Sequence, residues 1–193
     1  MSAANGAPLA RRLTLPAVLV SLALLLSLLE RMLAIDALTP VPGLRLGLPN
    51  IVTLFALWAL GRRPALAVLV LRCLLGALFG GRLSSLAFSL GGGLTAFAVM
   101  ALLLPLEGEE FSVVGVSIAG AAAHNAGQLL AARVVMGTPA VFAWFPFLLL
   151  GSLGTGTITG LLFSWLRPTL LRVPAIRAMV EESDGGRTAQ RSS

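Results

Sequence analysis

The 193-residue sequence has no lysine and no tyrosine, and it has only one cysteine and one histidine. A single cysteine excludes both an internal disulfide framework and a thiolate metal site. Aspartate occurs only at Asp36 and Asp184, so the carboxylate clusters that hold Mg²⁺ are missing. The Walker A pattern of nucleotide hydrolysis is also missing. We therefore expect no metal site and no cofactor, and we expect that the chain alone is not an enzyme.

Charge is scarce as well. Charged residues make up 11% of the sequence and hydrophobic residues 57%, and the mean hydropathy is +0.94. This composition is typical of an integral membrane protein, so the lipid bilayer is the first expected partner. All fourteen basic residues are arginines that lie between apolar runs and form no basic face, which argues against a nucleic-acid partner.

Long apolar runs predict an all-α integral membrane protein, a bundle of six transmembrane helices in one domain. We expect a cytoplasmic N-terminal segment over residues 1–12, a membrane domain over 13–166, and a cytoplasmic basic segment with a disordered tail over 167–193. The tail itself, residues 181–193, has the composition of a disordered end. The first apolar run is long and has no convincing cleavage site, so it is predicted to be an uncleaved helix. The six predicted helices cover residues 13–33, 46–60, 64–80, 84–105, 111–133 and 142–166.

The distribution of arginine predicts the orientation of this bundle. With both termini in the cytoplasm (N-in/C-in), nine of the fourteen arginines lie on the cytoplasmic side, and this is the side that basic residues prefer. The other five lie outside or within the membrane. They are Arg31, Arg45, Arg72, Arg82 and Arg133.

The fifth predicted helix carries the strongest functional signal. It contains His124, Asn125 and Gln128 in an uncharged stretch where polar groups are costly unless they face a cavity or a partner. On a helix these three cluster roughly opposite a stripe of small residues suited to close helix packing. They either line a ligand site or only form hydrogen bonds between helices. The stripe consists of Gly115, Ala119, Ala123 and Gly127.

The connection between the first two predicted helices is the second candidate region. It is rich in proline and glycine, which favours an ordered outer cover or a re-entrant segment. Glu30, Arg31, Arg45 and Asn50 flank or lie in it, and they are expected to form a polar lid over a pocket that opens outward. Asn50 is also expected to cap the second helix. The alternative is a salt bridge from Glu30 to an arginine that only pins the loop.

Arg72 is predicted to lie about two turns inside the third helix. A charged side chain at such a depth costs about 2.5 to 3.5 kcal/mol on insertion scales, so it needs a carboxylate, a helix end or an anionic ligand as a partner. Glu30 and the polar residues of the fifth helix are the nearest candidates. The alternative is that Arg72 reaches up to the outer surface.

Four segments of the sequence resemble a known family. They begin at Glu30 (ERMLAI), Pro42 (PGLRLGLPN), Leu71 (LRCLLGALFGG) and Val114 (VGVSIAGAAAHNAGQLL). Together they resemble the Gx transporter family, whose members are often labelled heptaprenyl diphosphate synthase component I, over about residues 14 to 166. Arg45 stands where that family commonly has lysine, and Pro49 stands where a small residue is usual.

The resemblance implies a bacterial plasma-membrane protein that is similar to the substrate-binding S components of energy-coupling-factor transporters. It implies a pocket that faces outward, a vitamin-like small-molecule substrate, and an energy-coupling transmembrane subunit with ATPases as partners. The label implies instead a non-catalytic accessory role in making the heptaprenyl chain of menaquinone. A structural scaffold for another membrane complex is the third hypothesis.

Overall fold

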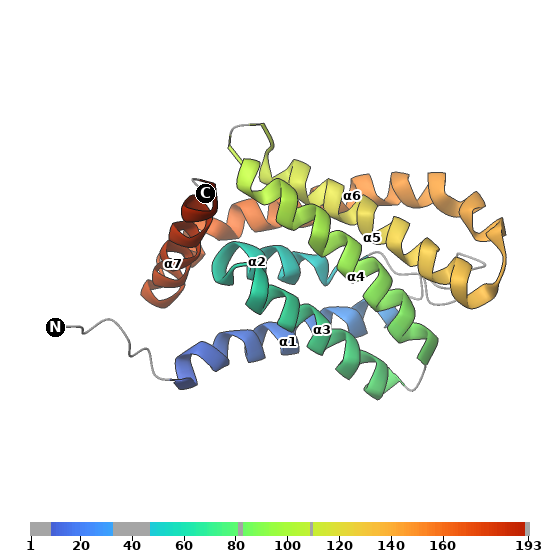
Figure 1. The fold of residues 1–193 in the computed structure, drawn as a ribbon, viewed down its shortest axis with the longest axis horizontal. Helices are drawn as coiled ribbons and strands as arrows, with labels where there is room; N and C mark the ends of the chain where they lie inside the picture. The colour runs from blue at the N-terminus through green and yellow to red at the C-terminus, as the bar shows by residue number, and fades with distance from the viewer. Residues whose placement is uncertain (1–8, 33–46, 81–82, 109, 192–193) are drawn as a thin grey trace.

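The computed structural model describes residues 9–32, 47–80, 83–108 and 110–191, and it is almost entirely helical (Figure 1). Within these ranges there is no strand, and the only β feature is an isolated bridge between Glu107 and Phe111. The prediction of an all-α fold is therefore confirmed. The α-helices are α1 (Leu9–Met32), α2 (Asn50–Leu60), α3 (Arg62–Gly80), α4 (Leu83–Leu103), α5 (Val113–Met136), α6 (Phe145–Leu170) and α7 (Pro174–Arg191).

Four segments of the described chain are long and apolar enough to cross a membrane. They are Leu13–Met32, Arg62–Gly80, Ser84–Leu106 and Pro139–Leu170. Helix α2 has only 11 residues, which corresponds to about 16 Å of helix against a hydrocarbon core of about 30 Å. Helix α5 has 24 residues, but its imidazole and amide groups lower its hydropathy.

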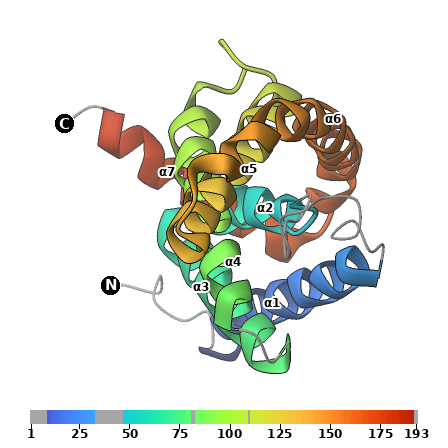
Figure 2. The same ribbon diagram turned by 90° about the vertical axis from the view of Figure 1, so that its right-hand side faces the viewer.

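Helix α2 lies at the centre of the bundle. A single residue, Gly61, joins it to α3, and its positive φ of 81° allows the tight reversal. Eight of the eleven residues of α2 are buried, including Trp58 with 2% exposure. Helices α1 and α6 pack against α2 from two sides (Figure 2). Helices α2 and α3 therefore form a tight hairpin, with α2 as its inner arm.

Close backbone contacts hold α4, α5 and α6 together. A Cβ atom on Gly127 would clash with the carbonyl oxygen of Gly91, so the backbones of α4 and α5 are in direct contact. The Thr95 hydroxyl donates a hydrogen bond to the carbonyl of Ala123 across the same contact, at 2.8 Å. On the other side of α5, a Cβ on Gly156 would lie 2.5 Å from the Cα of Ile118. Small residues therefore let α5 approach both neighbours.

The C-terminal region differs from the sequence prediction. Residues 181–193 were expected to be disordered, but Pro174–Arg191 forms helix α7, and only 192–193 lie outside the described chain. Ile176 and Val180 stand four residues apart and pack against the core, while Arg177 and Glu181 form an i,i+4 ion pair at 3.0 Å. The prediction was wrong because it considered the polar end of this helix without its apolar beginning.

Helix α7, the start of α1 and the α2–α3 junction all lie at the same end of the bundle (Figure 1). This end holds an ion pair between Arg167 and Glu107, and the Arg167 guanidinium also lies 5.3 Å from the ring centroid of Trp58. The C-terminal end of α1 and the N-terminal end of α2 point the opposite way. The candidate site lies between the middle of the bundle and that opposite end.

Candidate functional site

Helix α5 presents the central polar residues, and its sequence defines both of its ends. The Ser112 hydroxyl accepts a hydrogen bond from the Gly115 N–H at 3.0 Å, as an N-terminal cap does. At the other end Gly137 adopts a left-handed conformation, with φ of 68°, and its N–H donates to the carbonyl of Arg133. His124 therefore lies about half-way along a helix with two well-defined ends.

His124 and Gln128 form a buried pair on one face of α5. Their exposed fractions are 3% and 0%, and the amide nitrogen of Gln128 lies 2.6 Å from Nε2 of His124. Since an amide NH₂ group only donates, Nε2 accepts this bond, and in the neutral ring the proton is on Nδ1. The pair therefore presents Nδ1 toward α4 as a donor.

Helix α4 approaches this pair at a glycine. A Cβ on Gly92 would lie 2.7 Å from Cγ of Gln128 and 2.8 Å from Cε1 of His124. Real Cβ atoms do not come this close to other heavy atoms, so any side chain at position 92 would displace the pair. The glycine run at 91–93 therefore shapes the candidate site.

Asn125 does not join the pair. It is 2% exposed, and its amide donates a hydrogen bond to the carbonyl of Leu148 in α6, at 2.8 Å. A step of one residue turns a helix by 100°, so Asn125 faces α6 while His124 faces α4. The three polar residues that the sequence grouped together are thus divided, and Asn125 fits the packing alternative.

The residues just before α2 cover His124. Gly47 has a φ of 83°, and a Cβ there would lie 2.7 Å from Nδ2 of Asn50 and 2.9 Å from Cδ2 of His124. Asn50 is 7% exposed, and neither its Oδ1 nor its Nδ2 has a hydrogen-bond partner in the described part of the chain. The expectation that the Asn50 side chain caps α2 is wrong. Pro49 occupies the N-cap position, and it makes no side-chain hydrogen bond.

Glu30 holds this segment in place. It is 3% exposed, and its Oε1 accepts hydrogen bonds from the backbone N–H groups of Gly47 at 2.5 Å and Leu48 at 3.2 Å. A carboxylate that accepts backbone N–H groups forms a strong, charge-assisted contact. Glu30 therefore ties the C-terminal end of α1 to the start of α2, which lies directly on His124.

Arg72 is buried in the bundle with an exposed fraction of 5%. It does not reach the surface, so the alternative proposed from the sequence is wrong. Its Nη2 atom lies 3.3 Å from the position of a Cβ on Gly93, next to the glycine that contacts His124. Within the described ranges no hydrogen bond or ion pair involves its guanidinium, and Nε and Nη2 are buried without a partner. A charge buried in this way is costly unless something outside these residues neutralises it.

Of the other two predicted arginines, one is described, and it lies away from this site. Arg31 turns toward α3, where its Nη2 donates to the carbonyl of Gly76 at 2.9 Å and its guanidinium packs against Gly80. Arg45 lies outside the described residues. Hydroxyl groups of α6 form hydrogen bonds within the bundle; for example, the Thr159 hydroxyl bonds to that of Ser117 at 2.8 Å.

We use the name polar cluster for the buried polar side chains that lie next to the glycine run of α4 or at the start of α2. It offers a cation, an amide with a free donor and a free acceptor, and an imidazole–amide pair in otherwise apolar surroundings. Such a set suits a small molecule with an anionic group and further hydrogen-bonding atoms. No group of three or more metal-ligating side chains occurs among the described residues. The polar cluster consists of Glu30, Asn50, Arg72, His124 and Gln128.

Sequence reasoning missed the roles of Gly47 and Gly92. Each brings the backbone of its own segment against the imidazole of His124: Gly47 from the residues just before α2, and Gly92 from α4. For Gly47 the available signal was a glycine two residues before a proline at the start of a helix. For Gly92 the signal was a run of three glycines inside an apolar helix, which is rare unless another element packs closely there.

An all-α bundle with membrane-length helices and a buried polar cluster belongs to the class of helical membrane proteins. The chain belongs to the family described as heptaprenyl diphosphate synthase component I, whose model matches residues 19–166. The matched region contains the whole polar cluster and ends before α7. This confirms the family that the sequence motifs indicated. Neither the curated proteins nor the solved structures offer a match to the chain.

Proposed function

We propose that this protein is a membrane-embedded binding component that captures a small anionic molecule at the polar cluster and works together with partner subunits. The observation that carries this proposal is Arg72, which is 5% exposed as a residue and whose guanidinium has no partner among the described residues. An ionisable residue inside a membrane domain is by default a candidate for function. The free amide of Asn50 supports the same site.

The proposed topology has six membrane passes, α1 to α6, with both termini in the cytoplasm of a bacterial cell. In this orientation Glu30 and the start of α2 face the outer side, and α7 lies at the cytoplasmic surface. The excess of arginine at the cytoplasmic end supports the assignment. A short α2 is compatible with it because α2 is shielded from lipid by its neighbours.

Uptake of a vitamin-like nutrient is the form of this function that we favour. The chain has no nucleotide-hydrolysis motif, so an energy-coupling transmembrane subunit and ATPases would supply the energy. The word component in the family description also supports a partner subunit.

The test is native mass spectrometry of the full chain, purified gently in detergent. We expect a small anionic molecule to remain bound to the wild type and to Arg31→Gln, and to be lost from Arg72→Gln. Arg31 is the matched control, since its guanidinium donates to the Gly76 carbonyl and lies outside the polar cluster. An equally loaded Arg72→Gln variant, or an empty wild type, would refute the proposal.

A second candidate is a non-catalytic accessory role in heptaprenyl diphosphate synthesis, which the family description favours. The two functions differ in what deletion of the gene does. An accessory subunit is required for quinone side-chain synthesis even when every nutrient is in excess, whereas an uptake component is not. Co-purification with a prenyl synthase subunit and no small ligand would likewise favour the accessory role, and attached ATPases would favour uptake.

A further inference from the structure

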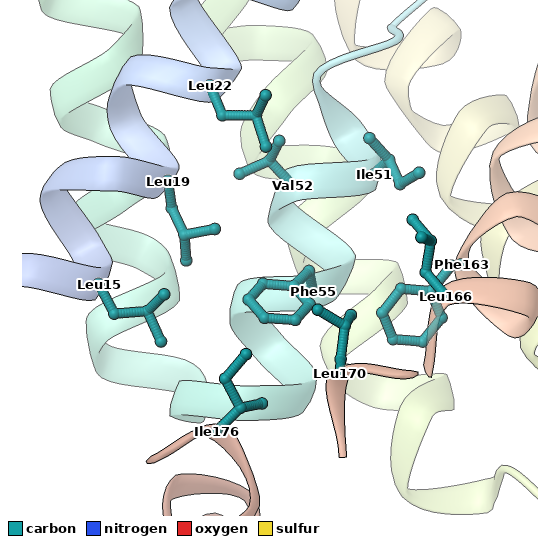
Figure 3. Close-up of a pocket in the computed structure, with 10 residues that line it drawn as sticks. All are labelled: Leu15, Leu19, Leu22, Ile51, Val52, Phe55, Phe163, Leu166, Leu170 and Ile176. Carbon is teal, nitrogen blue, oxygen red and sulfur yellow. The ribbon is translucent and has the colours of Figure 1, made fainter. Parts of the chain in front are cut away.

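An apolar cavity lies on the other side of the central helix, away from the polar cluster. It has a volume of about 250 Å³ and is bounded by α1, α2, α6 and the beginning of α7 (Figure 3). Leu19 and Leu22 of α1 face Phe55 of α2 and Phe163 of α6 across it. Leu170 and Ile176 lie at the end of the cavity where α6 passes into α7.

The lining of this cavity is entirely hydrocarbon, since every residue around it is leucine, isoleucine, valine or phenylalanine. Ile51, Val52 and Phe55 face it from α2. They lie on the side of that helix opposite Asn50, because each residue advances by 100°. Helix α2 therefore separates the apolar cavity from the polar cluster, and an occupant of one does not have to occupy the other.

A cavity of this kind offers no hydrogen-bond partner to water. Apolar cavities stay dry and bind apolar molecules, and side chains that border an empty gap lose dispersion contacts. Helices α1 and α6 make few direct contacts with each other although both pack on α2. The cavity lies between these two helices, both of which have membrane-spanning length, so a hydrocarbon chain from the bilayer is the occupant with direct access.

The charge near the cavity indicates the kind of amphiphile whose hydrocarbon chain occupies it. Leu170 and Ile176 are separated by a short turn, and Arg172 lies in that turn. Arg172 is exposed and has no ion pair within the described chain, whereas the nearby Arg177 is paired with Glu181. A free guanidinium in a turn whose flanking residues line an apolar cavity, on the predicted cytoplasmic side, matches an anionic headgroup.

We propose that the cavity between α1, α2 and α6 binds an acyl chain of an anionic phospholipid from the cytoplasmic leaflet, with its phosphate headgroup at Arg172. The lipid completes the packing around α2, and it binds independently of any molecule in the polar cluster. Arg172 provides the preference for an anionic headgroup, and the cavity holds the acyl chain.

The experiment places the full chain in nanodiscs made of equal amounts of phosphatidylglycerol and phosphatidylcholine. The protein is then extracted in mild detergent, and the retained lipid is measured by native mass spectrometry. We expect phosphatidylglycerol to be retained over phosphatidylcholine by about fivefold, as one arginine near an anionic headgroup provides. Equal retention of the two lipids, or retention of neither, overturns the proposal.

Two pairs of matched variants test the two parts of the site. Leu22→Trp fills the cavity, and its control, Leu153→Trp, places the same side chain on the exposed surface of α6 away from the cavity. We expect lipid retention to fall about tenfold for Leu22→Trp alone. Arg172→Gln is expected to abolish the headgroup preference, and Arg63→Gln, an exposed arginine at the same end, is expected to keep it. Equal behaviour within either pair overturns the corresponding part of the site.

A final competition experiment distinguishes a membrane phospholipid from another amphiphile with the same chemistry. Farnesyl diphosphate also combines a hydrocarbon chain with an anionic phosphate group. If it displaces phosphatidylglycerol at an equal concentration, the cavity is a prenyl-diphosphate site and the phospholipid assignment is wrong. If phosphatidylglycerol stays bound, the assignment holds.

Discussion

Replacement of Arg72 by methionine is expected to stabilise the ligand-free protein while it abolishes ligand binding. Arg72 is 5% exposed as a residue, and no described residue pairs with its guanidinium, so the folded state carries the cost of a buried charge. Insertion scales put this cost at about 2.5 to 3.5 kcal/mol. This value is an upper estimate of the increase in the free energy of unfolding in detergent when the charge is removed. For a chain of this length each kcal/mol raises the melting temperature by about 2 to 4 °C. The expected increase is therefore up to roughly 5 to 14 °C.

Thermal unfolding of the delipidated, ligand-free protein, followed by circular dichroism, measures this change. Arg31→Met is the matched control. It removes the hydrogen bond to the Gly76 carbonyl, so we expect a melting temperature equal to or lower than that of the wild type. If Arg72→Met lowers the melting temperature as much as Arg31→Met, then Arg72 has a structural partner, and the physical basis of the proposed site is wrong. A higher melting temperature for Arg72→Met alone distinguishes a functional from a structural arginine.

Three further predictions follow from the geometry of the polar cluster. Gly92→Ala places a Cβ against the buried imidazole–amide pair and is expected to cost about 1 to 3 kcal/mol in thermal unfolding, whereas Gly151→Ala, which meets no atom within 4 Å, is expected to be neutral. The double variant His124→Leu and Gln128→Leu is expected to lose the co-purified ligand in native mass spectrometry; unchanged ligand with a lower melting temperature would show that the pair only packs. Glu30→Leu leaves two backbone N–H donors unpaired at about 1 to 3 kcal/mol each, so hydrogen exchange at the start of α2 is expected to become faster. An unchanged exchange rate would contradict the role of Glu30 as the residue that holds this segment.

The helices were predictable because apolar runs separated by arginine, glycine and proline are a local signal. The first six α-helices lie where the runs predicted them, with ends that differ by a few residues. The choice of His124, Gln128 and Arg72 was also local, since a polar group in an apolar run is visible without a structure. The orientation of Asn125 was not predictable, because it depends on α6 lying beside that face of α5.

The errors have a common origin in information that the sequence does not contain. The side chain of Asn50 has the chemistry of a helix cap, but its position one residue past Pro49 leaves it inside the bundle with both polar atoms free. The tail over 181–193 has the composition of a disordered segment, yet Ile176 and Val180 anchor a helix that continues into it. In both cases the sequence showed the residue type, but it did not show which residues contact it in the fold.

The sequence by itself determined that this is an all-α chain of the membrane class, which residues are polar within its apolar runs, and to which family it belongs. These properties depend on composition and on short-range order along the chain. Only the tertiary structure decided that α2 is the central helix, that Arg72 lacks a partner among the described residues, and that a polar cluster and an apolar cavity lie on opposite sides of α2. Those properties depend on which residues from distant helices meet, and the packing of whole helices decides this.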